Sequence, residues 1–490
     1  MSVIQTKNID YTEKISQHSN PLFLKVQPIN NVQSFAPSIT SVFGPVEILI
    51  PARTIALNRS KISFDLLVPA QAASTYAWLQ ANALTLFDRI TLTSQASNAV
   101  LCDIPNANRY ASMLSPIMTT QEELNSKSSP YSSIGIHTAA GTAISAITVV
   151  PIMNTTLALA QRYQGEDISR SNAGANPDGN ANDTVGFANS IRKLLVSSST
   201  ATDNYVSFNF DLSSFHSTIF DVDKLLYFGG EQLLLSLYFS PVNRYCWGGT
   251  SNTNPATGFT VATGSFSITN LTMYLCVEQN IEISSALVER VNTKGLTIPF
   301  PYPFINRSSL AAPNISISQQ LTRGFGHRLL YVASSIFASL ETNNSAQDHS
   351  IQSLLLAPSA ATAANYPAFS VLNYNTFIDN IAVLTNSNIS IIGGGQNNSE
   401  FFTMNRAHLK GCAIQNITGY ALDFCHIDNF CTDSLCQADL TLIDGLDLSS
   451  THIYSWNCTG SSSNTPNLNV YLIFVCQKML HLNSAGVSVM

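Results

Sequence analysis

Charge is the most pronounced shortage in this sequence. Asp, Glu, Lys and Arg make up 11% of the 490 residues, whereas an ordinary soluble domain carries about 25%. Because charged side chains keep a protein surface soluble, a chain with so few of them is poorly suited to a fully solvated surface. Two interpretations stay open at this point. Either other subunits cover much of the surface, or the chain is a secreted or cell-surface β-protein.

Clusters of basic residues and long apolar segments are also missing. The net charge is −7, and no run of Lys and Arg offers the phosphate neutralisation on which nucleic-acid binding depends. The first twenty residues lack the apolar stretch of a signal peptide. The best candidate span, residues 139–153, is too short and too rich in Ser and Thr to cross a membrane. The sequence therefore predicts no direct sequence-specific nucleic-acid binding, no transmembrane segment and no secretion.

The nine cysteines form neither a disulfide nor a metal-binding pattern. Without a secretory signal, a disulfide framework is not expected. The tightest group, CHIDNFCTDSLC at 425–436, has the spacing C-x5-C-x4-C and lacks the C-x2-C pair typical of zinc sites. We therefore interpret the cysteines as free thiols, and we expect no bound metal and no cofactor.

Motifs with a catalytic or phosphate-binding mechanism are absent as well. The sequence contains no GxGxxG, GxxxxGK[ST], HExxH or GxSxG motif, and the Gly-rich stretch at 393–398 opens no expected helix. His327 and His408 lack metal-ligand spacing. A β-sandwich glycosidase needs two carboxyl groups about 5–10 Å apart, and the candidates are Asp88, Asp103, Glu122, Glu123, Asp221, Asp223, Glu231, Asp379, Asp444 and Asp447. Because only three Trp accompany them, we predict no catalytic, cofactor-binding or metal-binding residues.

Alternation of apolar and polar residues predicts strands along most of the chain. In FDRITLTSQASNAVLCDIPNANRY (87–110), Ile90 and Leu92 alternate with threonines, SQASN supplies a turn, and AVLCDI runs back as a second strand. This pattern predicts a hairpin, on which Arg89 is expected to pair with Asp88 or Asp103. Similar strand patterns occur at 46–52, 60–70, 205–212, 231–242, 265–277, 296–304, 327–340, 388–392, 437–448 and 467–480.

Helical patterns are few. Residues 106–124 favour one short helix on each side of Pro116. Residues 283–295 favour a helix with a serine in the N-cap region and Gly295 as the C-cap. The polar stretches at 171–190 and 457–467 indicate loops.

A short internal echo indicates duplication. NLTMYL (270–275) and NLNVYL (467–472) share four residues at matching positions. A polar turn precedes each copy, each opens a long strand, and the first copy leads into the helix expected at 283–295. We therefore predict an all-β fold of two tandem β-sandwiches, each of which closes with an equivalent strand.

Several stretches together resemble one viral protein family. Phe64-Asp65 lies in a strand that leads through a loop to the strand at Leu86–Leu92. The returning strand ends at Asp103-Ile104, and Asn108–Tyr110 begins a helix. This succession resembles the first sandwich of the double jelly-roll major capsid proteins of virophages and of Polinton-like or adintovirus-like double-stranded DNA viruses.

The resemblance continues through most of the chain. GGEQLLLSLYFSPVNRY (229–245) is similar to a late strand and loop of the first roll, and NLNVYLIFVCQKMLHL is similar to the closing strand of the second. The implied fold is two tandem eight-stranded jelly rolls with few short helices and long surface loops. The implied division is an N-terminal arm over 1–40, a first roll over 41–282, a linker helix over 283–295 and a second roll over 296–490.

The resemblance also implies a function. Such proteins are structural, not enzymatic, and form homotrimeric pseudo-hexagonal capsomers that tile an icosahedral shell around a double-stranded DNA genome. The expected partners are further copies of the chain in the trimer and in neighbouring capsomers, together with penton and minor or cement capsid proteins. The expected location is the capsid of a virion that is assembled inside the infected host cell. The alternatives are a single-jelly-roll coat or spike protein and a β-sandwich lectin or carbohydrate-active protein.

Overall fold

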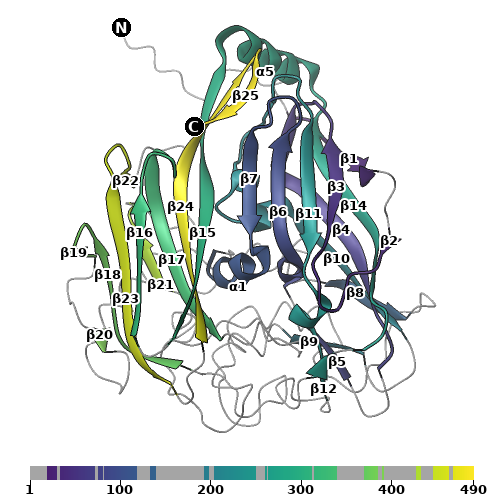
Figure 1. The fold of residues 1–490 in the computed structure, drawn as a ribbon. Coiled ribbons are helices and arrows are strands. Elements are labelled where there is room, and N and C mark those ends of the chain that lie inside the picture. The colour runs from purple at the N-terminus through teal and green to yellow at the C-terminus, as the bar shows by residue number, and fades with distance from the viewer. Residues whose placement is uncertain are drawn as a thin grey trace, which may run out of the picture.

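The computed structural model contains two β-sandwiches standing side by side, with helix α5 at one end and the shorter helix α1 between them (Figure 1). It describes residues 19–29, 34–71, 76–80, 82–118, 133–138, 193–197, 203–249, 260–261, 263–311, 314–338, 369–383, 389–390, 426–431, 445–462 and 467–490.

Eight strands of the first sandwich form two antiparallel sheets. In chain order they are β1 (Pro21–Val26), β3 (Phe43–Ile50), β4 (Ile55–Val68), β6 (Phe87–Ser94), β7 (Val100–Pro105), β10 (Asn204–Asp211), β11 (Leu233–Phe239) and β14 (Ser267–Glu278). One sheet has the order β1-β14-β4-β10 and the other β3-β11-β6-β7. Counted along the chain, the first to eighth strands therefore lie in the orders 1-8-3-6 and 2-7-4-5. This is the arrangement of a jelly roll.

The second sandwich repeats this order. Its eight strands are β15 (Leu296–Ala311), β16 (Asn314–Leu321), β17 (Arg328–Ala338), β18 (Phe369–Ile378), β19 (Ile381–Ala382), β21 (His426–Asn429), β23 (His452–Ser462) and β24 (Asn467–Asn483). The sheets run β15-β24-β17-β21 and β16-β23-β18-β19, which is again 1-8-3-6 and 2-7-4-5. The two echoed sequences occupy residues 270–275 in the middle of β14 and residues 467–472 at the start of β24, and these are the eighth strands of the two rolls. The predicted equivalence of these closing strands is confirmed.

Smaller elements extend this framework. The short strands are β2 (Ser34–Phe35), β5 (Tyr76–Gln80), β8 (Ser133–Thr138), β9 (Lys193–Ser197), β12 (Cys246–Gly249), β13 (Thr260–Val261), β20 (Ile389–Ser390), β22 (Leu446–Asp447) and β25 (Gly486–Val489). The 3-10 turns are η2 (Ala83–Leu86), η4 (Leu212–Ser214), η5 (Ile219–Asp221) and η6 (Val242–Arg244). Strands β13, β12, β5 and β9 form a further sheet in that order.

The expected hairpin at 87–110 is present. Strands β6 and β7 pair antiparallel, with Ile90 opposite Ile104. Ile90 and Leu92 are buried while the intervening Thr91 is only partly covered, as the period of two requires when one face of a strand packs on a core. The turn closes with a hydrogen bond from the Ser94 amide to the Ala99 carbonyl at 2.9 Å.

The two helices differ in part from expectation. Helix α1 (Ala107–Met118) is a single helix that includes Pro116. Because proline has no N–H, the helix lacks the hydrogen bond from this residue to the carbonyl four residues earlier. Helix α5 (Ile281–Lys294) matches the expected helix, and its N-cap is Asn280, whose Oδ1 accepts hydrogen bonds from two backbone amides. Within the described part of the chain, neither helix has the length and apolar content needed to cross a bilayer.

Strand pairing bears on two other expectations. Within the predicted arm over 1–40, residues 21–26 form β1, which pairs along its whole length with β14. The loop predicted over 457–467 is wrong for residues 457–462, because β23 continues to Ser462 and pairs with β16 and β18. Cys458 of this segment lies in the core of the second roll. The predicted loop at 171–190 lies outside the described residues.

Candidate functional site: the joint between the two rolls

One sheet of the second roll, β15-β24-β17-β21, is buried on both faces. Along β24, Leu472 and Phe474 belong to the core of the second roll, whereas the alternate residues Tyr471 and Ile473 belong to an apolar cluster shared with the first roll. A strand that is covered on both faces needs apolar residues at every position. This explains the nearly unbroken apolar sequence of β24 and makes the joint between the rolls a continuous part of the core.

Buried hydroxyl groups connect the rolls near α1. The Ser217 Oγ of the first roll lies 2.5 Å from the Tyr331 hydroxyl of β17, and both side chains are buried. Ser217 has a φ of 57°, and its amide donates to the Asp221 carboxylate at 3.2 Å. In α1, the Tyr110 hydroxyl donates to the His216 carbonyl. Burial, followed by the nearby Tyr331, raises the pKa of Tyr110 well above its ordinary value, so this hydroxyl stays a neutral donor.

Glu231 of the first roll holds the final hairpin of the second. Its Oε1 accepts a hydrogen bond from the Val487 amide of β25 at 3.2 Å. Its Oε2 accepts hydrogen bonds from the Ser97 amide and hydroxyl and from the Ser94 hydroxyl. Gly486 has a φ of 125°, and a Cβ at this position would stand 2.2 Å from the Glu231 Oε1. Only glycine lets the hairpin approach the carboxylate this closely.

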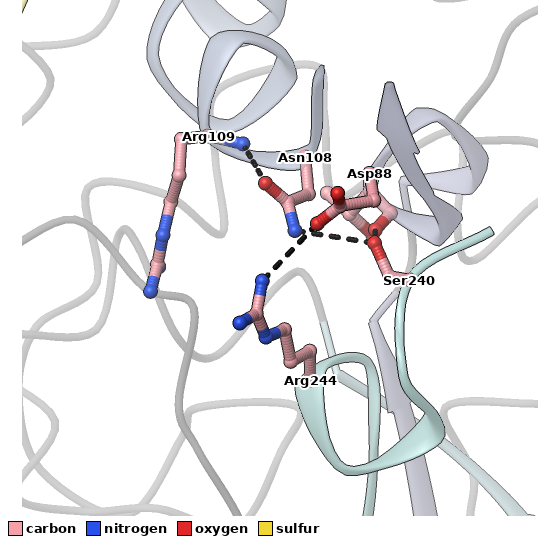
Figure 2. A network of polar contacts seen from close by, with 6 residues as sticks. Asp88, Asn108, Arg109, Ser240 and Arg244 are labelled. Carbon is pink, nitrogen blue, oxygen red and sulfur yellow. Dashed lines mark hydrogen bonds and ion pairs between the residues drawn. The ribbon is translucent and has the colours of Figure 1, made fainter. Parts of the chain in front are cut away.

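The two carboxylates of the first hairpin bind different arginines. The Arg89 Nε and Nη2 each donate to Asp103 at 2.8 Å, which confirms the expected pairing of Arg89 with one of the two. Asp88 instead accepts from the Arg244 Nη1 at 3.2 Å, at the base of α1 (Figure 2). Beside this ion pair, the Asn108 Nδ2 donates to the Ser240 Oγ at 3.1 Å (Figure 2). These contacts fasten the start of α1 to the strands and bring no two carboxyl groups together for catalysis.

The Arg89–Asp103 pair faces the second roll. The hydrogen bond with Asp103 raises the pKa of Arg89 above its ordinary value. Burial raises the pKa of the Tyr302 phenol of β15, and the nearby Cys102 and Asp103 raise it further. Strand β7 of the first roll lies against β15 of the second, with the Asp103 carboxylate of β7 near the Tyr302 phenol.

The remaining candidate carboxylates make local structural contacts. Asp223 accepts a hydrogen bond from Asn58 at 2.8 Å, and Asp447 accepts from the Ser449 amide at 3.0 Å. Asp379 accepts from His452 at 2.6 Å and from the Ile453 amide at 2.8 Å. Glu122, Glu123 and Asp444 lie outside the described residues.

The described cysteines and histidines show no metal centre. Within the described segments, no group of three or more His, Cys, Asp or Glu is placed to hold a metal ion. Burial raises the pKa of the Cys476 thiol to about 12, which keeps it protonated and unreactive. Burial also lowers the pKa of His327, whose amide donates to the Gln477 carbonyl at 2.7 Å. Outside the described residues lie Cys412, Cys425, Cys436, His408 and the Gly-rich stretch at 393–398.

Sequence reasoning did not anticipate the contacts that hold the joint. No sequence pattern marks Ser217 or Tyr331, and the sequence indicates Glu231 only as a candidate catalytic carboxylate. The sequence feature that could have indicated the role of Glu231 is the pair of glycines before it. One of them, Gly229, adopts a φ of 63° and lies close to the Asn483 carbonyl of the second roll. That signal indicates a close approach of two backbones and does not name the partner.

Three solved virus structures share this fold along almost their whole length. The PBCV-1 virus capsid is 11% identical with a TM-score of 0.51, and the match covers 96% of this chain and 97% of that chain. The Sputnik virophage structure is 12% identical with a TM-score of 0.51, covering 100% and 93%. PBCV-1 VP54, fitted into a reconstruction of Sputnik, is 10% identical with a TM-score of 0.50, covering 96% and 97%.

Comparison of sequences alone does not detect this structural similarity. No protein-family model matches the chain, and no curated protein is similar to it in sequence. At about one identical residue in ten, the likeness concerns the fold, which the repeated strand order establishes independently. The chain therefore has the double jelly-roll fold that the PBCV-1 capsid and Sputnik structures share with it.

Proposed function

We propose that the chain is a structural major capsid protein. It self-assembles as homotrimeric pseudo-hexagonal capsomers that tile an icosahedral viral shell around a double-stranded DNA genome. One observation carries this proposal: two complete jelly rolls with the same strand order fill the described chain from β1 to β24. The solved structures that share this whole arrangement come from virus particles.

The chemistry of the described residues supports a structural role in preference to an enzymatic one. Asp88 and Asp103 are held by separate arginines, and Glu231 is occupied by four hydrogen-bond donors from two rolls. Catalytic carboxylates need room for a substrate and a shared geometry, whereas these serve to hold strands, helix α1 and the last hairpin in place.

We propose the following division of the chain. The first roll extends to residue 282, the linker helix covers 283–295, and the second roll covers 296–490. The arm comprises the residues that precede β1. The partners are other copies of the chain, neighbouring capsomers, and penton and minor or cement capsid proteins. The protein works in the virion capsid, after assembly inside the infected host cell.

The mass of the purified protein in solution tests the proposal. Light scattering after size exclusion should give three times the 53.0 kDa of one chain, and negative-stain images should show hexagonal outlines. A stable monomer at the same concentration would contradict the capsomer. Binding to a glycan array would then test the lectin alternative.

A further inference from the structure

The turn that connects β16 to β17 brings two basic side chains into contact. The Arg323 Nη2 lies against the His327 Nδ1. A guanidinium group carries only hydrogen-bond donors, so this imidazole nitrogen is the acceptor and the ring proton of His327 is on Nε2. The contact therefore requires a neutral His327, because a protonated ring would point an N–H at another N–H and place two positive charges side by side.

The charged and titratable groups around this pair do little to favour a positive charge on His327. On β24, His481 acts against protonation, and Lys478 lies over aromatic rings of β15. On β22, Asp447 favours protonation, and its effect is the smallest of those that act on the imidazole. The Asp447 carboxylate already accepts hydrogen bonds from the Ser449 amide at 3.0 Å and from the Ser449 hydroxyl at 3.1 Å.

The backbone of His327 connects this turn to two further segments of the second roll. Its amide donates to the Gln477 carbonyl of β24 at 2.7 Å, and its carbonyl accepts from the Leu448 amide, just after β22, at 3.0 Å. Within the turn, the Phe325 ring packs against the Phe304 ring with 4.7 Å between the centroids. A movement of the turn therefore disturbs the ends of these strands and the aromatic packing beneath them.

We propose that the Arg323–His327 pair is an acid-sensitive clip, in which protonation of His327 breaks the contact and loosens the start of β17 from β22 and β24. At neutral pH the pair holds the turn closed over the backbone hydrogen bonds of His327. In acid, repulsion between the two cations drives the exposed Arg323 side chain away and opens the turn. The clip lies within one chain, so the inference does not depend on the proposed function.

The direction of the pH response follows from the surroundings of His327. Burial, followed by Arg323 and His481, lowers the pKa of this imidazole, and Asp447 only partly offsets these effects. The unfolded chain therefore takes up the proton near the ordinary pKa of about 6.5, at a higher pH than the folded chain does. The contribution to stability is complete above this pH, is lost as the pH falls through it, and changes no further below the folded value.

Urea unfolding of the full chain at one protein concentration, between about pH 8 and pH 5, measures this response. The urea midpoint of the unaltered chain should fall on acidification. His327→Gln removes the titrating group and Arg323→Gln removes the cation, so each should reduce this fall. In the double variant, Arg323→Gln should add nothing to the effect of His327→Gln, because the pair is already broken. Arg328→Gln is the matched control, since Arg328 donates instead to the Gly445 carbonyl at 3.1 Å, and it should leave the fall unchanged.

Hydrogen exchange at the His327 and Leu448 amides tests the local opening. After correction for the intrinsic rate, exchange in the peptides that contain them should be faster in acid for the unaltered chain and not for His327→Gln. An equal fall of the midpoint in the unaltered chain and in His327→Gln would overturn the clip, and so would a fall that depends on His327 without faster exchange at these amides. If His327→Gln does not fold, Arg323→Gln decides, because an unchanged fall in that variant excludes the pair.

Discussion

Removal of the Asp428 carboxylate is expected to destabilise the second roll by about 3–5 kcal/mol. Asp428 lies on β21 in the interior of that roll and is 2% exposed. Its Oδ1 is 2.8 Å from the His426 Nε2 and accepts from the Thr376 hydroxyl at 3.2 Å. Its Oδ2 accepts from the Tyr454 hydroxyl at 2.7 Å. One carboxylate thus connects three strands, β18, β21 and β23, across the two sheets of the roll.

The magnitude follows from what each substitution removes. Asp428→Ala takes the acceptor from three buried donors, and each such loss costs about 1–3 kcal/mol before the surroundings relax. Asp428→Asn keeps the shape and one acceptor oxygen, so we expect about half of that loss. Tyr454→Phe removes only one hydroxyl and should cost about 1–1.5 kcal/mol. In the double variant with Asp428→Ala, the cost of Tyr454→Phe should almost vanish, because its acceptor is already gone.

The assay is denaturant unfolding followed by tryptophan fluorescence. Trp456 is fully buried in the same core, whereas Trp78 and Trp247 lie on β5 and β12 of the first roll. Replacing those two by Phe in every variant leaves a signal from the second roll alone. A loss below about 1 kcal/mol for Asp428→Ala, or fully additive effects in the double variant, would refute the reasoning, since surface-like contacts have energies of that size.

Three further predictions concern the joint, the acid response and the first strand. Gly486→Ala should lower the free energy of unfolding by about 1–3 kcal/mol, because its Cβ would collide with the Glu231 Oε1, while Gly324→Ala, which meets only an ordinary contact, should be nearly neutral. The hydrogen bond from His452 lowers the pKa of Asp379, so its ionised form stabilises the fold above the unfolded pKa of about 3.9. That contribution is lost as the pH falls through the folded value, and melting curves of Asp379→Asn should lack this acid-dependent loss. Deleting residues 1–18 should leave the melting temperature unchanged. Deleting 1–40 removes β1 and β2 and exposes the edge of β14, which should lower it by several degrees. Equal melting of the two truncations would show that these two strands add nothing to the first roll.

The sequence by itself determined the local structure and the duplication. Alternation in β6, where Ile90 and Leu92 face the core, requires only that neighbouring residues point to opposite faces of a strand. Helix α5 follows from its own periodicity and from Gly295, which adopts a φ of 71° at its end. The paired NLTMYL and NLNVYL segments mark the same strand of both rolls because equivalent positions meet equivalent packing. Each of these signals is contained in a short stretch of neighbouring residues.

Only the tertiary structure decided which distant residues meet. The polar end of β23 resembles a loop in sequence, yet it is a strand because β16 and β18 supply backbone partners on both sides. β1 joins the first roll through β14, about 250 residues away along the chain, and no local pattern specifies that partner. Ser217 meets Tyr331, and Glu231 meets Val487, because the two rolls bury a common sheet face. Hydrogen bonds between residues so far apart depend on the packing of whole sheets, which composition and periodicity do not contain.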